Sequence, residues 1–146
     1  MSEQFFNNVN KIQFEGPDST NPFAFRYYDE NQVVNGKTMK EHLRFAACYW
    51  HNFCWAGSDI FGAGTFDRPW IQATGNQLQL AEQKAAVAFE FFEKLGVPYF
   101  CFHDADIAPE GNSLKEFHAN VNHIADIFEK EMQRTGVELL WGTANL

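Results

Sequence analysis

The chain has 146 residues, 45% of them hydrophobic and 16% aromatic, and a formal net charge of −8. This length suits a single domain of ordinary size, and the hydrophobic content excludes a wholly disordered chain because it is enough to build a packed core. The acidic balance argues against a nucleic-acid partner, since binding to phosphates needs a basic face.

The three cysteines, Cys48, Cys54 and Cys101, lie in apolar surroundings and form no CxxC motif. An odd number of such cysteines indicates buried, reduced thiols, which are typical of a cytoplasmic protein. No apolar run approaches the roughly 18 residues that cross a membrane. The first residues also lack the basic and apolar regions of a secretory signal. We therefore expect a cytoplasmic location.

Residues 1–37 contain several turn signals, among them Asn35-Gly36, and few regular patterns. Their scattered aromatic side chains must pack on something, which predicts an irregular N-terminal extension wrapped over a main domain of residues 38–146. Thr38 opens a capping-box pattern and predicts a short helix at this boundary.

The next two segments differ in regularity. The dense apolar and aromatic run at residues 45–53 predicts a buried strand. Residues 56–70 are rich in glycine and predict an irregular loop. A loop of this length is unusual in a compact domain, and such loops often carry function.

Two helices then alternate with two further strands. Small and aromatic residues recur at helical spacing over 77–95, and Gly96 is suited to end that helix. The apolar run 97–102 predicts a strand, 113–135 a second amphipathic helix, and 137–142 a third strand. Strands joined by helices are parallel neighbours, so the fold class is α/β, with doubly wound sheets and (β/α)8 barrels as the two common outcomes.

The stretch from His103 to Asp106 follows directly after a predicted parallel strand, where α/β proteins bind ligands. A carboxylate beside a histidine can fix one ring nitrogen as a donor and leave the other facing a substrate for proton transfer. Two alternatives stay open at this point. The pair could serve only to satisfy loop amides, or His103, Asp104 and Asp106 could bind a divalent metal ion.

Four further residues are candidates for a binding pocket, and each has a structural alternative. Trp50 and Trp141 could be pocket walls, or they could belong to the core. Phe61 lies on the glycine-rich loop, where a large ring is costly to expose unless it covers a ligand or a neighbouring subunit. Thr143 could donate a hydrogen bond to a hydroxyl, or it could simply pack at the end of its strand.

Seven short segments closely resemble bacterial xylose isomerases of the longer class, which carry an N-terminal extension. They are residues 15–19 (EGPDS), 42–45 (HLRF), 49–51 (YWH), 64–70 (GTFDRPW), 101–104 (CFHD), 108–111 (APEG) and 140–145 (LWGTAN). The resemblance runs in register over essentially the whole chain, which makes it far more specific than any single motif.

The resemblance implies a (β/α)8 barrel that interconverts D-xylose and D-xylulose, with D-glucose and D-fructose as slower substrates. It also implies two divalent metal ions, Mg²⁺, Mn²⁺ or Co²⁺, which polarise the open-chain sugar during a hydride shift. The family is homotetrameric, and the sugar is the partner that its active site binds.

The same resemblance assigns roles to residues of this chain. It implies that His103 is the catalytic histidine for ring opening and that Asp106 orients it. It implies that Trp50 is the aromatic wall beside the migrating hydrogen, and that Phe61 reaches into a neighbouring subunit's active site. Trp141 and Thr143 match pocket positions near the far end of the sugar.

The length departs from the family, because a barrel of this kind needs about 250 residues. Only the N-terminal extension and roughly three βα units are expected here. No carboxylate occupies a family metal position, so the ligands are expected beyond residue 146. The chain is therefore expected to be an N-terminal portion that is inactive alone. The alternatives are a non-catalytic fragment that associates with its missing half or other subunits, and a related barrel enzyme such as a sugar epimerase or metal-dependent hydrolase.

Overall fold

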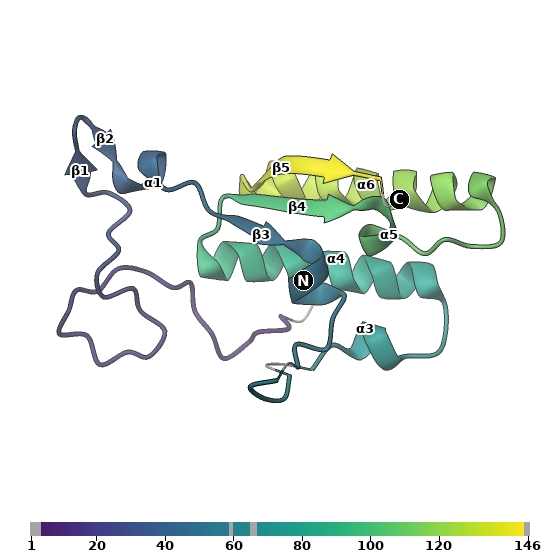
Figure 1. Cartoon of the computed structure of the whole chain (residues 1–146), viewed down its shortest axis with the longest axis horizontal. Helices are drawn as coiled ribbons and strands as arrows, with labels where there is room; N and C mark the ends of the chain where they lie inside the picture. Colours follow the sequence, from purple (N-terminus) through teal and green to yellow (C-terminus); the bar gives the residue numbers. More distant parts are fainter. Residues whose placement is uncertain (1–3, 59, 65–66, 145–146) are drawn as a thin grey trace.

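The computed structural model describes residues 4–58, 60–64 and 67–144. Its centre is a three-stranded parallel sheet of β3 (Ala46–Cys48), β4 (Tyr99–His103) and β5 (Glu138–Thr143), in that order (Figure 1). The predicted parallel strands at 97–102 and 137–142 are confirmed with small shifts of their ends. The three strands form an open sheet, and the described residues contain no closed barrel.

The two long helices, α4 (Gln77–Leu95) and α6 (Leu114–Thr135), match the predicted helices closely. Gly96 and Gly136 follow them in the left-handed conformation, with φ of 74° and 73°. Glycine adopts this conformation without a steric cost, so both helices end where the sequence predicts. No helix in the described part of the chain is long and apolar enough to cross a membrane.

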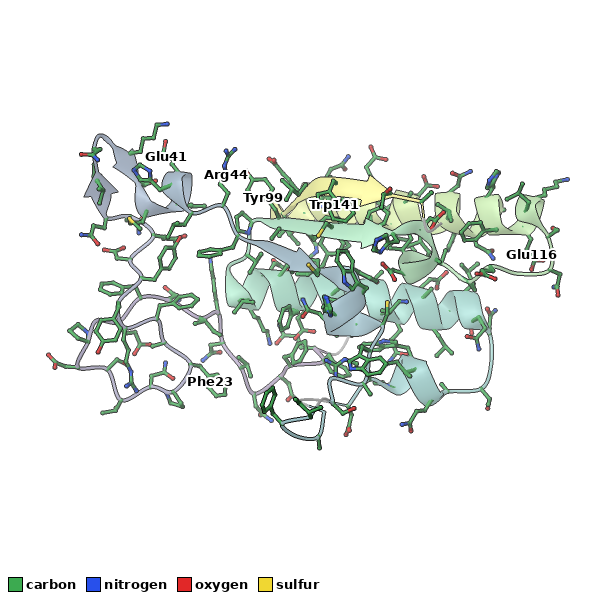
Figure 2. The ribbon with its side chains drawn as sticks, viewed as in Figure 1. Phe23, Glu41, Arg44, Tyr99, Glu116 and Trp141 are labelled. Carbon is green, nitrogen blue, oxygen red and sulfur yellow. The ribbon has the colours of Figure 1, made fainter. Side chains whose placement is uncertain are left out.

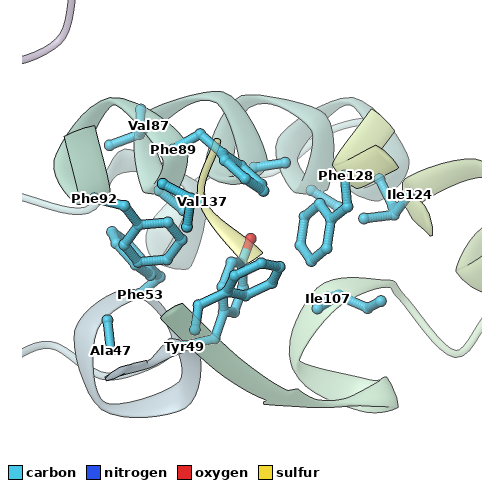
Figure 3. Packing of buried hydrophobic residues seen from close by; sticks show 14 of the residues in the cluster. Ala47, Tyr49, Phe53, Val87, Phe89, Phe92, Ile107, Ile124, Phe128 and Val137 are labelled. Atoms are coloured by element: carbon cyan, nitrogen blue, oxygen red, sulfur yellow. The ribbon is translucent and has the colours of Figure 1, made fainter. Parts of the chain in front are cut away.

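Both helices cover the same face of the sheet, as the contacts of Phe100 on β4 demonstrate. The ring of Phe100 stacks on Phe92 of α4 at 5.4 Å between centroids and meets Phe128 of α6 edge-on at 5.5 Å. Phe89 of α4 contacts both Phe100 and Phe128. Phe89, Phe92 and Phe128 are labelled in the view of the core in Figure 3. These aromatic side chains are fully or almost fully buried and form the centre of the core.

The predicted strand at 45–53 is wrong beyond its first residues, because the chain turns into the short helix α2 (Tyr49–Phe53). Tyr49 and Phe53 are one helical turn apart, and both are completely buried. Helical geometry places residues four apart on one face, so both rings point into the core. The helix thereby frees Trp50 to project away from the core.

The remaining elements are short. A hairpin of β1 (Val33–Val34) and β2 (Lys37–Thr38) precedes α1 (Met39–His42), which has the predicted capping box at Thr38. α3 (Pro69–Gln72) begins at the end of the glycine-rich loop, and α5 (Asp104–Ile107) follows β4 directly. Residues 59, 65 and 66 of that loop lie outside the described part of the chain.

The N-terminal arm, residues 4–42, attaches to the rest of the molecule mainly through α4. The amides of Phe5 and Phe6 donate to the Glu90 carboxylate at 2.8 and 2.9 Å, and the Ile12 amide donates to the Lys94 carbonyl at 2.7 Å. Farther along, the arm and its hairpin lie beside the sheet and helices, and Phe23 is half exposed (Figures 1 and 2).

Candidate active site

His103 and Asp106 lie at the carboxyl end of β4, where the strand passes directly into α5. His103 is the last residue of the strand, and Asp106 stands three residues later on the first turn of the helix. The Asp106 Oδ2 atom accepts a hydrogen bond from the His103 backbone amide at 2.8 Å and lies 2.9 Å from the His103 Nδ1 atom. The predicted hydrogen bond between the two side chains is therefore confirmed.

This geometry determines which ring nitrogen of His103 carries the proton. A carboxylate only accepts hydrogen bonds, so Nδ1 must be the donor when the ring is neutral. The lone pair of the neutral ring is then on Nε2, for which the described residues provide no hydrogen-bond partner. The imidazole is 30% exposed and Asp106 is 15% exposed, so solvent or a ligand can reach the ring while the carboxylate stays sheltered.

Two tryptophans from other elements stand beside the imidazole. The Trp50 ring of α2 lies 4.6 Å from the His103 ring, measured between centroids, and 5.7 Å from the Trp141 ring of β5. Trp141 is also 5.9 Å from His103 (its place on the sheet is labelled in Figure 2). Thr143 is the β5 residue paired with His103, so their side chains leave the sheet on the same face.

The structure therefore brings together five of the six residues that the sequence singled out: His103, Asp106, Trp50, Trp141 and Thr143. The sixth, Phe61, lies on the loop between α2 and α3, and its side chain is 89% exposed. The described ring contacts of His103, Trp50 and Trp141 do not include it.

Two supporting residues were missed by the sequence analysis. Lys84 on α4 donates from Nζ to the Asp106 backbone carbonyl at 2.5 Å, and the Cys54 thiol at the end of α2 donates to the same oxygen at 3.4 Å. Burial raises the pKa of the Cys54 thiol, and the nearby Asp106 charge raises it further against the opposing effect of Lys84. Cys54 thus stays protonated and remains a donor. A lysine on an amphipathic helix is ordinary, so nothing in the sequence marked it.

One pair of thiols lies on the adjacent strands β3 and β4. Cys48 and Cys101 are paired in the β3–β4 register, and their sulfur atoms are 3.9 Å apart. Burial, together with the hydrogen bond to Cys48, raises the pKa of Cys101 to about 11. All three cysteines are free thiols.

The metal-ligand alternative for His103, Asp104 and Asp106 has no geometric support. Within residues 4–144, apart from the undescribed positions of the loop, no three histidine, cysteine, aspartate or glutamate side chains are grouped so that they could hold a metal ion. Asp104 instead accepts a hydrogen bond from the Ala105 amide at 2.8 Å.

These features define an α/β protein with a histidine–carboxylate pair at the end of a parallel strand and an aromatic wall beside it. No family model matches the chain. It is, however, 64% identical to the xylose isomerase of Photobacterium profundum over 142 residues. It is 62% identical to that of Haemophilus influenzae and 61% identical to that of Actinobacillus pleuropneumoniae, each over 141 residues. These alignments cover 97% of the chain but 32% of each relative. The chain is a homologue of xylose isomerases and spans about a third of their length.

Proposed function

We propose that this chain supplies the acid–base part of a xylose isomerase active site, in an enzyme that interconverts D-xylose and D-xylulose and, more slowly, D-glucose and D-fructose. The observation that carries the proposal is the hydrogen bond between His103 and Asp106 at the carboxyl end of a parallel strand. The identity of about 60% to relatives with that name supports the choice of reaction.

In the proposed mechanism His103 opens the sugar ring. The Nδ1–H group of His103 donates a hydrogen bond to Asp106, so the imidazole can accept the proton of the anomeric hydroxyl at Nε2. It can then return a proton from Nε2 to the ring oxygen of the sugar. Asp106 keeps the imidazole in this tautomer and stabilises the positive charge that develops on it. Acid–base assistance of this kind contributes about 10²–10⁴ to a rate.

The two tryptophans form one side of the proposed sugar site. Trp50 packs against His103 and presents an apolar face that excludes water from the reacting carbons, while Trp141 continues the wall toward β5. Sugars bind aromatic faces through their C–H groups and use their hydroxyls for hydrogen bonds. We assign one such hydrogen bond to the Thr143 hydroxyl, on the strand beside His103.

The described residues contain no three-ligand cluster, so they do not fit a divalent metal ion. Two ions such as Mg²⁺, Mn²⁺ or Co²⁺, held by other residues, would supply Lewis-acid activation of the open-chain sugar. We expect the ligands on residues outside 1–146. Ring opening by His103 and orientation by Asp106 use this chain's side chains alone.

The rest of the proposal concerns assembly. We infer that the sheet is the first part of a (β/α)8 barrel, which is supported by two crossover helices on one face and by β5, whose described residues pair only with β4. We also infer a homotetramer in which the exposed Phe61 ring enters a neighbouring active site. The free thiols are in keeping with a cytoplasmic enzyme.

The proposal can be tested with a chimera in which this chain replaces the aligned part of the Photobacterium profundum xylose isomerase. We expect the chimera to convert D-xylose to D-xylulose, and we expect His103→Asn to lower kcat/KM by at least about 100-fold. The matched control is His123→Asn, because His123 is an exposed histidine of α6 that pairs with Glu82 of α4. Equal activity of the two variants would contradict the assigned role of His103.

A second candidate function is association without catalysis. The apolar side chains of Leu139, Leu140 and Trp141 on β5 are all exposed, which favours pairing of this strand with a further segment. If this is the only role, the chimera would assemble into the parent oligomer, as judged by size-exclusion chromatography, without isomerising xylose. The chain of residues 1–146 alone is expected to form no xylulose with any of the three metals.

A further inference from the structure

Lys84 occupies an unusual place in the middle of α4, because its ammonium group lies close to three groups that belong to two elements of the candidate site, α2 and α5. It donates to the Asp106 carbonyl of α5 at 2.5 Å, lies 3.7 Å from the Cys54 sulfur at the end of α2, and stands 5.6 Å from the centre of the Tyr49 ring of α2. Lys84 therefore joins the helix that carries Trp50 to the helix that carries Asp106.

The carbonyl that Lys84 holds is the backbone carbonyl of Asp106, near the end of α5. α5 has four residues, so the carbonyl of Asp106 has no partner inside the helix. It receives two donors instead, the Lys84 ammonium and the Cys54 thiol. A cation near the last carbonyls of a helix also interacts favourably with the helix dipole. The backbone of Asp106 is thus held by two donors from outside α5.

We propose that Lys84 is a positioning residue for ring opening, which fixes the backbone of Asp106 so that its carboxylate stays on the Nδ1 atom of His103. This inference rests on the proposed function for its kinetic consequence, but its structural part does not. Asp106 makes both of its hydrogen bonds to His103 through Oδ2. A shift of α5 would therefore break the hydrogen bond between Asp106 and the Nδ1 atom of His103, and the imidazole could then adopt the other tautomer.

The structural part is tested with the 146-residue chain by ¹H–¹⁵N spectra of its imidazole groups, with the His103 signals assigned through His103→Asn. Lys84→Met keeps the aliphatic stem but removes the N–H donors. We expect it to reduce the population of His103 rings protonated at Nδ1 and to weaken the downfield signal of the Nδ1 proton. Unchanged His103 signals in this variant would overturn the proposal.

The matched control is Lys94→Met, on the same helix. Lys94 also donates to a backbone carbonyl, that of Phe6, and it pairs with Glu90 at 3.0 Å, far from His103 in the fold. We expect this variant to leave the His103 signals unchanged. If both lysine variants disturb His103 equally, Lys84 is only a stabilising residue and the proposal is wrong.

Two further variants keep the test decisive if Lys84→Met does not fold. Lys84→Arg retains N–H donors on a longer side chain and should recover part of the Nδ1-protonated population. Cys54→Ala removes the second, weaker donor and should shift the His103 signals in the same direction as Lys84→Met, but less. A normal His103 spectrum in Cys54→Ala, together with a folded Lys84→Arg variant that has lost the Nδ1-protonated population although it keeps its N–H donors, would refute the positioning role.

The kinetic part is measured in the chimera. Misplacing a catalytic group by a fraction of an ångström is costly, so we expect Lys84→Met to lower kcat about 10-fold with KM changed less than about twofold. Lys94→Met should leave kcat within about twofold. A chimera that is inactive without any substitution would overturn the proposed function, whereas the imidazole spectra would still decide the role of Lys84.

Discussion

The N-terminal arm and the sheet with its two long helices are both rich in aromatic residues, yet they use them in opposite ways. Phe89, Phe92 and Phe100 are completely buried and contact one another, whereas Phe23 of the arm is 54% exposed and Tyr27 is 84% exposed. The aromatic content of this chain therefore combines a core with a surface that is available for contact. Composition alone does not separate the two.

The largest expected effect on the free energy of unfolding comes from a phenylalanine-to-alanine substitution, made once in the core and once in the N-terminal arm. Phe92→Ala leaves a cavity among Phe53, Phe89 and Phe100 and should lower the free energy of unfolding by about 3–5 kcal/mol. Phe23→Ala in the arm should lower it by less than about 1 kcal/mol. Urea unfolding followed by circular dichroism measures both, and comparable losses would mean that the arm belongs to the same cooperative core.

A smaller effect is expected at Glu90, which attaches the arm to α4. Its carboxylate is buried enough to raise its pKa, but Lys94 and the amides of Phe5 and Phe6 outweigh the burial and lower the pKa below 4.5. Glu90→Gln should therefore cost about 1–3 kcal/mol at pH 7.

The pH dependence of this contribution has a defined sign. A carboxylate with a lowered pKa in the folded state stabilises that state above its ordinary pKa, and the stabilisation is lost as the pH falls through the lowered value. The difference between the native chain and Glu90→Gln should thus shrink in unfolding experiments below about pH 4.5. Glu93→Gln, which breaks an exposed pair with Arg134, is the control and should cost no more than about 1 kcal/mol.

The smallest expected effect is a gain of stability inside the core. No described residue hydrogen-bonds to the hydroxyl of Tyr49, which is completely buried (Figure 3). Burial raises the pKa of Tyr49 well above 10, so the group stays a neutral, unpaired hydroxyl. Tyr49→Phe should raise the free energy of unfolding by about 1 kcal/mol, whereas Tyr99→Phe on a half-buried strand position should change it by less than about 0.5 kcal/mol. A loss of stability in Tyr49→Phe would point to a hydroxyl partner.

The parts of the fold that sequence could predict are those with local signals. The helical spacing of apolar residues and the glycines at 96 and 136 located α4 and α6 almost to the residue. His103 and Asp106 are three residues apart, so their hydrogen bond also depends mainly on local geometry. Asn35 and Gly36 signalled a turn, and both have positive φ, 50° and 79°, as a tight hairpin requires.

The parts that sequence missed depend on contacts between distant segments. A short apolar run fits a strand or a buried helix equally well, and only the backbone of the folded chain shows that residues 49–53 form the helix α2. The role of Lys84 required knowing that α4 packs beside the end of α2 and beside α5. No pattern within either segment contains that information.

One carboxylate oxygen lies within hydrogen-bond distance of both the backbone amide and the ring nitrogen of His103, and this arrangement bears on the proposed proton transfer. The hydrogen bond from the His103 backbone amide does not depend on the protonation state of the imidazole, so it would hold Asp106 in both states. In the proposed mechanism the carboxylate charge would therefore stay in place when an imidazolium forms, and α5 would not have to reorganise during proton transfer.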